Sequence, residues 1–406
     1  MLPSIGRIGG SPPLCAFRPN RMTASLLALG LYRSSGGPSK SIAAFQRALQ
    51  ADVISWVDPV AFAREPQIWN EIGCGSHVVT GSSLPVLKQL CFPQRDGLAS
   101  AEKLVARSQL VSCHSFWRWH NVWLQNVASL HRVPYWFVPH GALDPYVLDH
   151  DRRVKRAFLA LGGRRFLDQA QAVVCATRRE YEKLAHLVPA ARPAILPWPL
   201  DDDDFRARNE ESRTNVRQRL GIPYDSLVIL YFGRLNPMKR PLETIAAFAE
   251  GAPATAHLLV VGNEFGVTKQ ACMDAAKACC VADRVHVTGP AYGDDRAAYL
   301  DAADVYVSLS HRENFNFTAA EALAAGLPVM LSPGNDLGPE LGPVHCGWVL
   351  ATAADAAMAM AEAGRLSRQD LIAMGARGKT WAEANLRYDV FAGRLRQLAA
   401  DVLASD

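Results

Sequence analysis

The hydrophobic positions of the chain fall into short apolar runs that alternate with stretches of helical spacing, beginning near Ser25. Continuous apolar runs are typical of strands buried on both faces, and their alternation with helices predicts α/β domains with parallel sheets. In the first half we expect strands at Ser25–Tyr32, Asp52–Val57, His77–Thr80, Leu110–Cys113, Tyr135–Val138, Ala172–Ala176 and Ala194–Leu196. A Gly-rich loop at residues 34–39 follows the first run and precedes a helical pattern from Ser41 to Leu49, as in the opening unit of a doubly wound domain.

A second series of the same kind begins at Ser226. Leu227–Phe232 is predicted to be a strand, and Pro241–Glu250 a helix, because proline is well tolerated at the first helical position. Further strands are expected at His257–Val261, Arg284–Thr288, Val305–Ser308 and Pro328–Leu331. The Ala-rich segments Ala319–Ala325 and Ala351–Ala363 are predicted to be helices.

The two series predict two Rossmann-like domains, an N-terminal one over residues 23–197 and a C-terminal one over residues 226–406. Residues 198–225, which contain four consecutive aspartates, would link them, and the last helices would pack back towards the N-terminal domain. Residues 1–22 hold three arginines, no acid and no apolar centre. We expect them to be a disordered extension or an over-long start, with an Arg-rich transit peptide as the alternative.

The composition is that of an ordinary globular protein, with 49% hydrophobic and 20% charged residues in a chain of 406. No apolar run approaches the length of about 18 residues that a transmembrane helix needs. The nine cysteines are odd in number and form no C-x-x-C pair, which favours reduced thiols in a cytoplasmic protein.

The charge is distributed unevenly along the chain. Residues 1–200 hold 23 Lys and Arg against 12 Asp and Glu, and the remainder holds 20 against 27. A basic first half points to an anionic partner or surface. Basic residues gather in Arg152–Arg165 around apolar ones, a pattern that suits a solvated helix face or peripheral contact with an anionic membrane. Nucleic acid is the third alternative, and we expect none because no recognised binding module is present.

Two motifs in the second half carry candidate chemistry. Gly233–Lys239 follows a predicted strand and precedes a helix, so Arg234 and Lys239 can converge on a pair of phosphates near a helix N-terminus. The alternative is a surface loop with two solvated charges. In the second motif Glu313 and Glu321 lie eight residues apart on either side of a helix start. Thr318-x-x-Glu321 also reads as a capping box, which needs no ligand.

These motifs resemble glycosyltransferase family 4, the retaining group 1 enzymes of GT-B fold, in which two Rossmann-like domains face each other across a cleft. The family has a Gly-Arg…Lys element and a Glu-x7-Glu element at this separation. Upstream, Ser35–Pro38 looks like its first glycine loop, Pro139–Gly141 like its His-Gly element, and Ala176–Glu180 like the segment closing its first domain. The resemblance extends from about Ser25 to Tyr388.

The resemblance implies a nucleotide-sugar donor bound mainly by the second domain. Arg234 and Lys239 would hold the diphosphate and stabilise the charge that develops on it. Glu321 would bind the ribose, Glu313 the donor sugar or its phosphate surroundings, and His140 would sit beside the reacting sugar. The other residues on the donor side would be Gly36, Gly37, Asn314, Phe315 and Asn316.

Asn316 stands where the family usually has Gly, and if that position needs a positive φ, Asn is the best substitute. The family's favoured reaction is front-face attack in which the departing phosphate takes the acceptor's proton, so no protein nucleophile is assigned. We expect no cofactor, since the nucleotide-sugar is a co-substrate.

Two further groups of residues have competing interpretations. Asp201–Asp204 contains an Asp-x-Asp, the metal signature of the other major glycosyltransferase fold, but it lies at the domain junction and we expect no metal. His114 and Trp117 lie in an aromatic stretch that also contains His120. They predict either an acceptor-side wall or plain packing, while a zinc pair lacks supporting Cys or carboxylate spacing.

The sequence therefore predicts a retaining, metal-independent glycosyltransferase that acts in the cytoplasm or on the inner face of its membrane. Its acceptor would be a lipid-linked or polysaccharide intermediate of surface-polysaccharide biosynthesis. A sugar-nucleotide epimerase of the same fold, and a non-catalytic binding or partner subunit with a degenerate site, are the alternatives.

Overall fold

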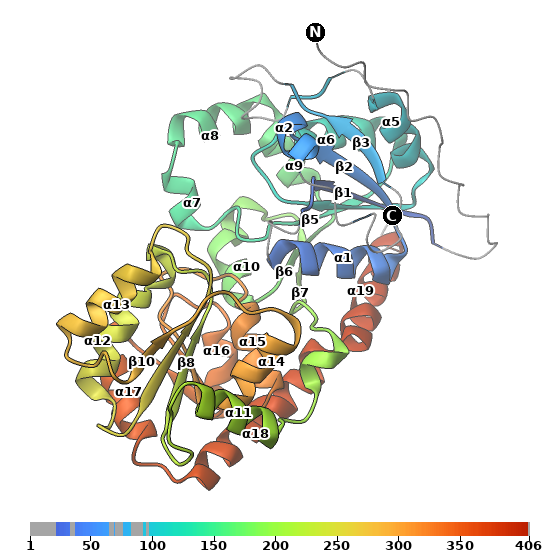
Figure 1. Ribbon diagram of the computed structural model, residues 1–406. Helices are drawn as coiled ribbons and strands as arrows, with labels where there is room; N and C mark the ends of the chain where they lie inside the picture. The colour runs from blue at the N-terminus through green and yellow to red at the C-terminus, as the bar shows by residue number, and fades with distance from the viewer. Residues whose placement is uncertain are drawn as a thin grey trace. The chain divides into compact units, whose positions relative to one another are not determined.

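The computed structural model describes residues 22–32, 37–64, 69, 76–82, 92–94 and 97–404 (Figure 1). The expectations for residues 1–21 and for Gly36 lie outside the described residues. The chain forms two compact units, each of which is described by itself. The first takes the described residues up to Phe137 together with Ala157–Gln171 and the chain from Ala399 on, and the second takes Val138–Arg156 and Ala172–Leu398.

The first sheet has seven strands in the order β3-β2-β1-β4-β5-β6-β7. The strands are β1 (Ala24–Leu29), β2 (Asp52–Val57), β3 (Ser76–Thr80), β4 (Leu110–His114), β5 (Tyr135–Val138), β6 (Ala172–Cys175) and β7 (Arg192–Ile195). β1 pairs in parallel with both β2 and β4, and its residues are almost all buried. Each strand predicted in this half of the sequence forms, which confirms the α/β class.

The helices of this half are α1 (Gly37–Leu49), α2 (Pro59–Arg64), α5 (Leu98–Arg107), α6 (Trp119–His131), α7 (Pro145–Asp149), α8 (Arg152–Phe158), α9 (Arg164–Gln169) and α10 (Arg178–Leu184). The expectation of one basic helix over Arg152–Arg165 is wrong. A π-helical turn at Leu159–Gly163 separates α8 from α9, because Gly162 adopts φ 133°, which is open to glycine and strained for other residues.

The second sheet has six strands in the order β10-β9-β8-β11-β12-β13, and each of its pairings is parallel. The strands are β8 (Val228–Phe232), β9 (His257–Val261), β10 (Val285–Val287), β11 (Val305–Ser308), β12 (Val329–Leu331) and β13 (Gly347–Val349). Sequence reasoning missed β13, which contains a glycine and is only partly buried, so no apolar run marks it. The core of this unit gathers apolar side chains of neighbouring strands, among them Ile229, Leu258, Val305 and Met330.

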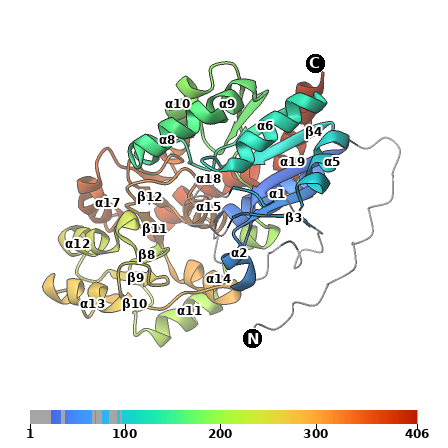
Figure 2. The same cartoon turned by 90° about the horizontal axis from the view of Figure 1, so that it is seen from above.

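The helices of this half are α11 (Glu210–Arg219), α12 (Pro241–Gly251), α13 (Lys269–Ala278), α14 (Gly293–Ala302), α15 (Phe317–Ala324), α16 (Gly338–Leu341), α17 (Ala356–Ala363), α18 (Arg368–Leu386) and α19 (Tyr388–Leu403). Some of them cover the two faces of the second sheet. α12, α13 and α17 lie on one face and α14, α15 and α16 on the other (Figures 1 and 2). Within the described part of the chain, no helix is long and apolar enough to cross a bilayer.

Candidate functional site

The loop after β8 carries the two candidate phosphate ligands. Asn236 caps the short 3-10 helix Pro237–Lys239, its Oδ1 accepting the backbone N–H of Lys239 at 2.9 Å. This cap fixes the turn that separates the two cations. The Arg234 guanidinium is exposed and lies 5.3 Å from the centre of the Phe265 ring, whereas the Lys239 side chain is only 22% exposed.

Lys239 meets Glu313, since its Nζ forms an ion pair with the Oε1 of that carboxylate. Burial, and to a smaller extent the nearby Arg234 charge, lower the pKa of Lys239 to about 8. At neutral pH the ammonium is therefore still mostly charged. Two residues that the sequence places far apart thus come together at the carboxyl ends of β8 and β11.

The loop that carries Glu313 is held by its backbone. The Glu313 N–H donates to Gly334 O, and the Asp336 N–H donates to Glu313 O, each at 2.8 Å. On the other side the His311 N–H donates to Met238 O, also at 2.8 Å. Gly334 is required here, because a Cβ at this position would collide with the carbonyl oxygens of the neighbouring loop.

Asn316 is the N-cap of α15, with φ −91°. The left-handed backbone considered for this position is therefore not adopted, and the replacement of Gly by Asn has another reason. The Asn316 Oδ1 accepts the Ala319 N–H at 3.2 Å, and its Nδ2 donates to Asn335 Oδ1 at 2.8 Å. Asn316 thus joins α15 to the loop that follows β12.

The capping-box alternative for Glu321 is wrong, because α15 begins at Phe317 with Asn316 as its N-cap, so Thr318 lies inside the helix. The Thr318 hydroxyl donates to Asn316 Oδ1 at 2.8 Å and does not cap the helix. The Glu321 side chain is only 4% exposed and forms an ion pair with Arg296 of α14. Its carboxylate is therefore held by a cation from another element, which sequence spacing alone does not reveal.

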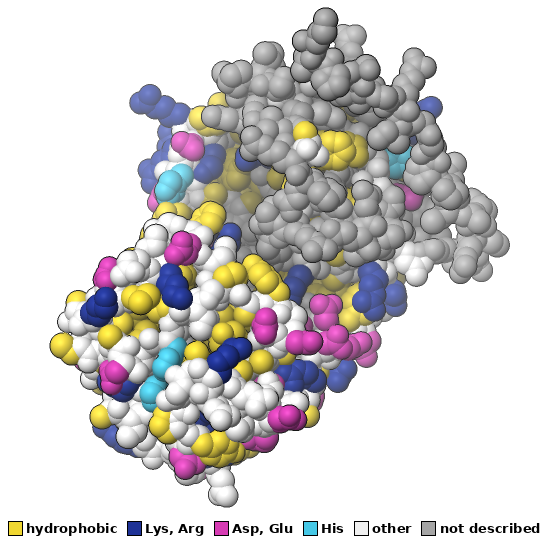
Figure 3. All heavy atoms as spheres, viewed as in Figure 1, with side chains coloured by type: hydrophobic (Ala, Val, Ile, Leu, Met, Phe, Trp, Pro, Cys, Tyr) yellow, Lys and Arg dark blue, Asp and Glu magenta, His cyan; other side chains and the backbone are white. Residues whose placement is uncertain are grey.

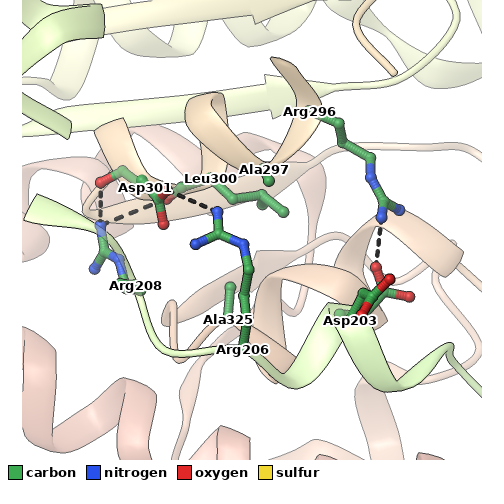
Figure 4. A pocket seen from close by; sticks show the side chains of 9 residues that line it. Asp203, Arg206, Arg208, Arg296, Ala297, Leu300, Asp301 and Ala325 are labelled. Atoms are coloured by element: carbon green, nitrogen blue, oxygen red, sulfur yellow. Dashed lines mark hydrogen bonds and ion pairs between the residues drawn. The ribbon is translucent and has the colours of Figure 1, made fainter. Parts of the chain in front are cut away.

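Arg296 also forms an ion pair with Asp204, at the rim of a small recess that is partly open to solvent (Figure 4). In this recess Arg206 donates to the Asp301 carboxylate at 2.7 Å, and Arg208 to the Asp301 carbonyl at 2.7 Å. Asp204 further accepts the Asp201 N–H at 3.2 Å. The aspartate run thus caps a turn and pairs with arginine. Among the described residues, no three His, Cys, Asp or Glu side chains gather as a metal site would need.

His140 follows β5 and lies in the second unit. Its backbone has φ 49°, and its ring centre is 5.4 Å from that of Trp198. Burial lowers the pKa of His140 to about 3, so the imidazole is neutral at physiological pH. A neutral imidazole can donate or accept one hydrogen bond, but it carries no charge to offer a phosphate.

Glu180, at the start of α10, is a residue whose contacts sequence reasoning missed. Its Oε1 accepts the Gly141 N–H at 2.7 Å and its Oε2 accepts the Ala176 N–H at 2.8 Å. The Asn314 amide lies 3.4 Å from the same Oε1. From the sequence, Thr177-x-x-Glu180 predicts a local capping box, so nothing in this pattern indicates that Glu180 contacts the His140–Gly141 turn.

The candidate acceptor residues lie in the first unit and are buried. His114 ends β4, with its Nε2 2.9 Å from the Ser112 hydroxyl and its ring against Phe45. Trp117 packs against Phe116 and Phe158, with ring centres 4.8 and 5.7 Å away. These contacts are those of the packing alternative. Gly37 begins α1, which also takes in the end of the predicted glycine loop, and residues 34–36 of that loop lie outside the described residues.

Comparisons with known proteins agree with these motifs. Residues 212–366 match the family model described as glycosyl transferases group 1. D-inositol 3-phosphate glycosyltransferase of Xylanimonas cellulosilytica is 33% identical over 235 residues, which cover 52% of this chain and 55% of that protein. The chain thus spans about half the length of the curated relatives it matches.

Solved structures resemble the chain over nearly its whole length. Anabaena HepE in complex with UDP and glucose aligns with a TM-score of 0.72 and 16% identity, covering 95% of this chain and 100% of HepE. WaaG, a glycosyltransferase involved in lipopolysaccharide biosynthesis, aligns with a TM-score of 0.60 and 16% identity, covering 94% of this chain and 100% of WaaG. These likenesses confirm the expected GT-B fold.

Proposed function

We propose that this protein, whose residues 212–366 form a group 1 glycosyltransferase domain, transfers a sugar from a nucleotide-sugar to an acceptor with retention of configuration. One observation supports this above the others. The matched region contains Arg234, Lys239 and Glu313, and the last two meet in a largely buried ion pair.

The ion pair suggests how the donor would bind. A diphosphate can replace the Glu313 carboxylate as the partner of Lys239, and the exposed Arg234 can reach the same group from the loop start. Charge-assisted hydrogen bonds strengthen as negative charge develops on the leaving phosphate, so both cations would act on the transition state. HepE was solved with UDP, and we propose a UDP-sugar as the donor class.

The reaction would need no protein nucleophile. The bond between the anomeric carbon and the phosphate oxygen breaks, and the acceptor oxygen attacks the same face of the sugar. The acceptor's proton passes to the departing phosphate. His140, being neutral, would hydrogen-bond a sugar hydroxyl, and Glu321 would accept hydrogen bonds from the ribose. Because Arg234 and Lys239 supply the positive charge, we propose that the reaction is independent of a metal ion.

The acceptor we propose is lipid-linked or a growing polysaccharide, used on the cytoplasmic face of a membrane in surface-polysaccharide biosynthesis. WaaG acts in a related biosynthesis. α8 supports a membrane contact, because Arg152, Arg153 and Arg156 are exposed beside the apolar Val154, which is 53% exposed. Figure 3 shows acidic and basic side chains interspersed on the visible face of the second unit.

The test is transfer of labelled sugar from UDP-glucose and other UDP-sugars to lipid extracts and oligosaccharides, with and without EDTA. We expect a labelled acceptor product of retained configuration that survives chelation. Release of an isomerised nucleotide-sugar without acceptor product would instead identify an epimerase. Absence of both products, with no nucleotide binding in calorimetry, would indicate a non-catalytic subunit.

A further inference from the structure

The Glu180 carboxylate is a junction of three chain segments within the second unit. Its two oxygens accept N–H groups from the turn after β5 and from the end of β6, and the Asn314 amide approaches from the loop that carries Glu313. The side chain is only 3% exposed. Two of these segments carry residues that the proposed function requires, His140 and Glu313.

We propose that ionised Glu180 is a positioning residue that holds the His140–Gly141 turn against the Asn314 loop, and that its protonation releases this arrangement. The inference rests on the proposed function for its kinetic consequence, but not for its structural one.

The geometry explains why protonation matters. Each oxygen of Glu180 already accepts a backbone N–H, at 2.7 and 2.8 Å. A carboxylic acid must place its own O–H on one of these oxygens, where a donor would then face a donor. The turn after β5, or the backbone at Ala176, must move to relieve that conflict.

The groups around Glu180 are consistent with a carboxylate that takes up its proton near neutral pH. Asp336, in the loop after β12, repels the Glu180 charge, but Lys183 holds Asp336 through two contacts of 2.7 and 2.8 Å. From β6 the neighbouring group is the Cys175 thiol, whose pKa burial raises. Burial is the main reason that the pKa of Glu180 rises to about 7, and the backbone hydrogen bonds oppose it.

The remaining charges of these elements belong to other contacts. On α10, Arg179 lies 3.6 Å from Asp336, and after the His140 turn Asp144 pairs with Lys183 at 2.9 Å. His140 itself is neutral, its pKa lowered to about 3 by burial. A loss of activity between pH 8 and 6 would therefore arise from Glu180 and not from the histidine beside the sugar.

The kinetic test compares the pH dependence of kcat/KM in the wild type, in Glu180→Gln and in Glu182→Gln. With Glu180 ionising near pH 7 and Lys239 losing its proton near pH 8, we expect a wild-type profile with an acid limb, on which activity falls about tenfold for each pH unit well below 7, and an alkaline limb above pH 8. Glu180→Gln presents an amide where the acid has its proton, so its activity should be low and its profile should lack the acid limb near pH 7. Glu182, exposed on the same helix, is the matched control and should keep the wild-type profile. A Glu180→Gln variant that retains the limb near pH 7 would overturn the inference.

A second measurement needs no activity and no variant. Hydrogen exchange of the Gly141 and Ala176 amides, corrected for the intrinsic effect of pH, should be faster at pH 6 than at pH 8 in the wild-type protein. Equal protection at both pH values would refute the coupling even if the enzyme is a glycosyltransferase. Conversely, pH-dependent protection in a protein that transfers no sugar would uphold the coupling and reject only the proposed function.

Discussion

Lys239 and Glu313 form an ion pair that joins the loop after β8 to the loop after β11. The pairing cannot be predicted from the sequence around either residue, because the two lie in loops far apart in the chain. The pair holds the Lys239 ammonium in a largely buried position beside the Glu313 carboxylate. Under the proposed function, the donor diphosphate would take the place of that carboxylate. Such an arrangement favours polydentate anions, since a diphosphate can engage Arg234 and Lys239 together whereas a single carboxylate engages one.

Loss of either cation should weaken catalysis. Charge-assisted hydrogen bonds contribute about 1.5–3 kcal/mol each, so Arg234→Ala or Lys239→Ala should lower kcat/KM by about tenfold to a few hundredfold. Steady-state kinetics with the donor varied would measure this. Lys269→Ala, at an exposed position in the first turn of α13, is the control and should leave kcat/KM unchanged. Wild-type turnover in both the Arg234→Ala and the Lys239→Ala variant would contradict the assignment of these residues as phosphate ligands.

Glu321 has two roles that a combined substitution can separate. Glu321→Gln should raise the donor KM by about tenfold, the equivalent of about 1.4 kcal/mol, and should lower Tm because Arg296 loses one of its two buried partners. In Asp204→Asn/Arg296→Met/Glu321→Gln none of the three charges is left unpaired, so Tm should recover in large part while the donor KM stays high. Recovery of both quantities would mean that Glu321 only holds Arg296.

Acid should destabilise the fold through buried neutral histidines. Burial lowers the pKa of His120 and of His140 to about 3, against 6.5 for the free side chain. Between these values the unfolded chain binds more protons, so this contribution to stability is complete above pH 6.5 and is lost as pH falls towards 3. The pKa of Glu180 is raised from 4.5 to about 7, so its contribution to the stability of the fold is instead lost as pH rises through this range.

The comparison that isolates one histidine is urea denaturation of the wild type and of His140→Gln at pH 7.5 and pH 5. The wild type should lose more of its free energy of unfolding than the variant on this change of pH. Equal losses in the two proteins would show that His140 does not stay neutral when the protein is folded.

Membrane contact by α8 should depend on charge. Replacing Arg152, Arg153 and Arg156 with Gln should reduce binding to anionic vesicles, because surface attraction contributes about 1 kcal/mol for each basic residue near the surface. Binding of the wild type should also weaken as salt is added. Vesicle co-sedimentation measures both effects. If the wild type binds neutral vesicles as well as anionic ones, α8 is a solvated surface helix.

Strands were predictable from the sequence because their signal is local. Asp52–Val57, Tyr135–Val138 and His257–Val261 form with the bounds that their apolar runs predict. By contrast β13 was not predictable, since its partly exposed Gly-Trp-Val segment shows no apolar run and it is identified by its pairing with β12. Gly162 shows a third case, in which one backbone conformation divides a helix that looked continuous by charge and periodicity.

Side-chain roles were less predictable, because distant residues decide them. Two Thr-x-x-Glu patterns read alike in the sequence, at Thr177 and at Thr318. In the first pattern Thr177 caps α10, while Glu180 accepts the Ala176 N–H instead of the N–H of Thr177. In the second pattern the N-cap of the helix is Asn316 and not Thr318. The contacts that determine the roles of these glutamates come from other elements. Glu180 accepts the N–H of Gly141, 39 residues away, and Glu321 pairs with Arg296 of α14.

The glycine at position 334 has a consequence for redesign. The backbone at Gly334 lies so close to the carbonyls of Ser310 and His311 that a Cβ would collide with them. The Glu313 loop therefore packs between the main chain at Gly334 on one side and at Met238 on the other. A loop that is wedged in this way does not drift when its side chains are exchanged. Under the proposed function, libraries aimed at altering sugar preference should therefore leave Gly334 untouched, and they should also keep Asn314, whose amide approaches Glu180.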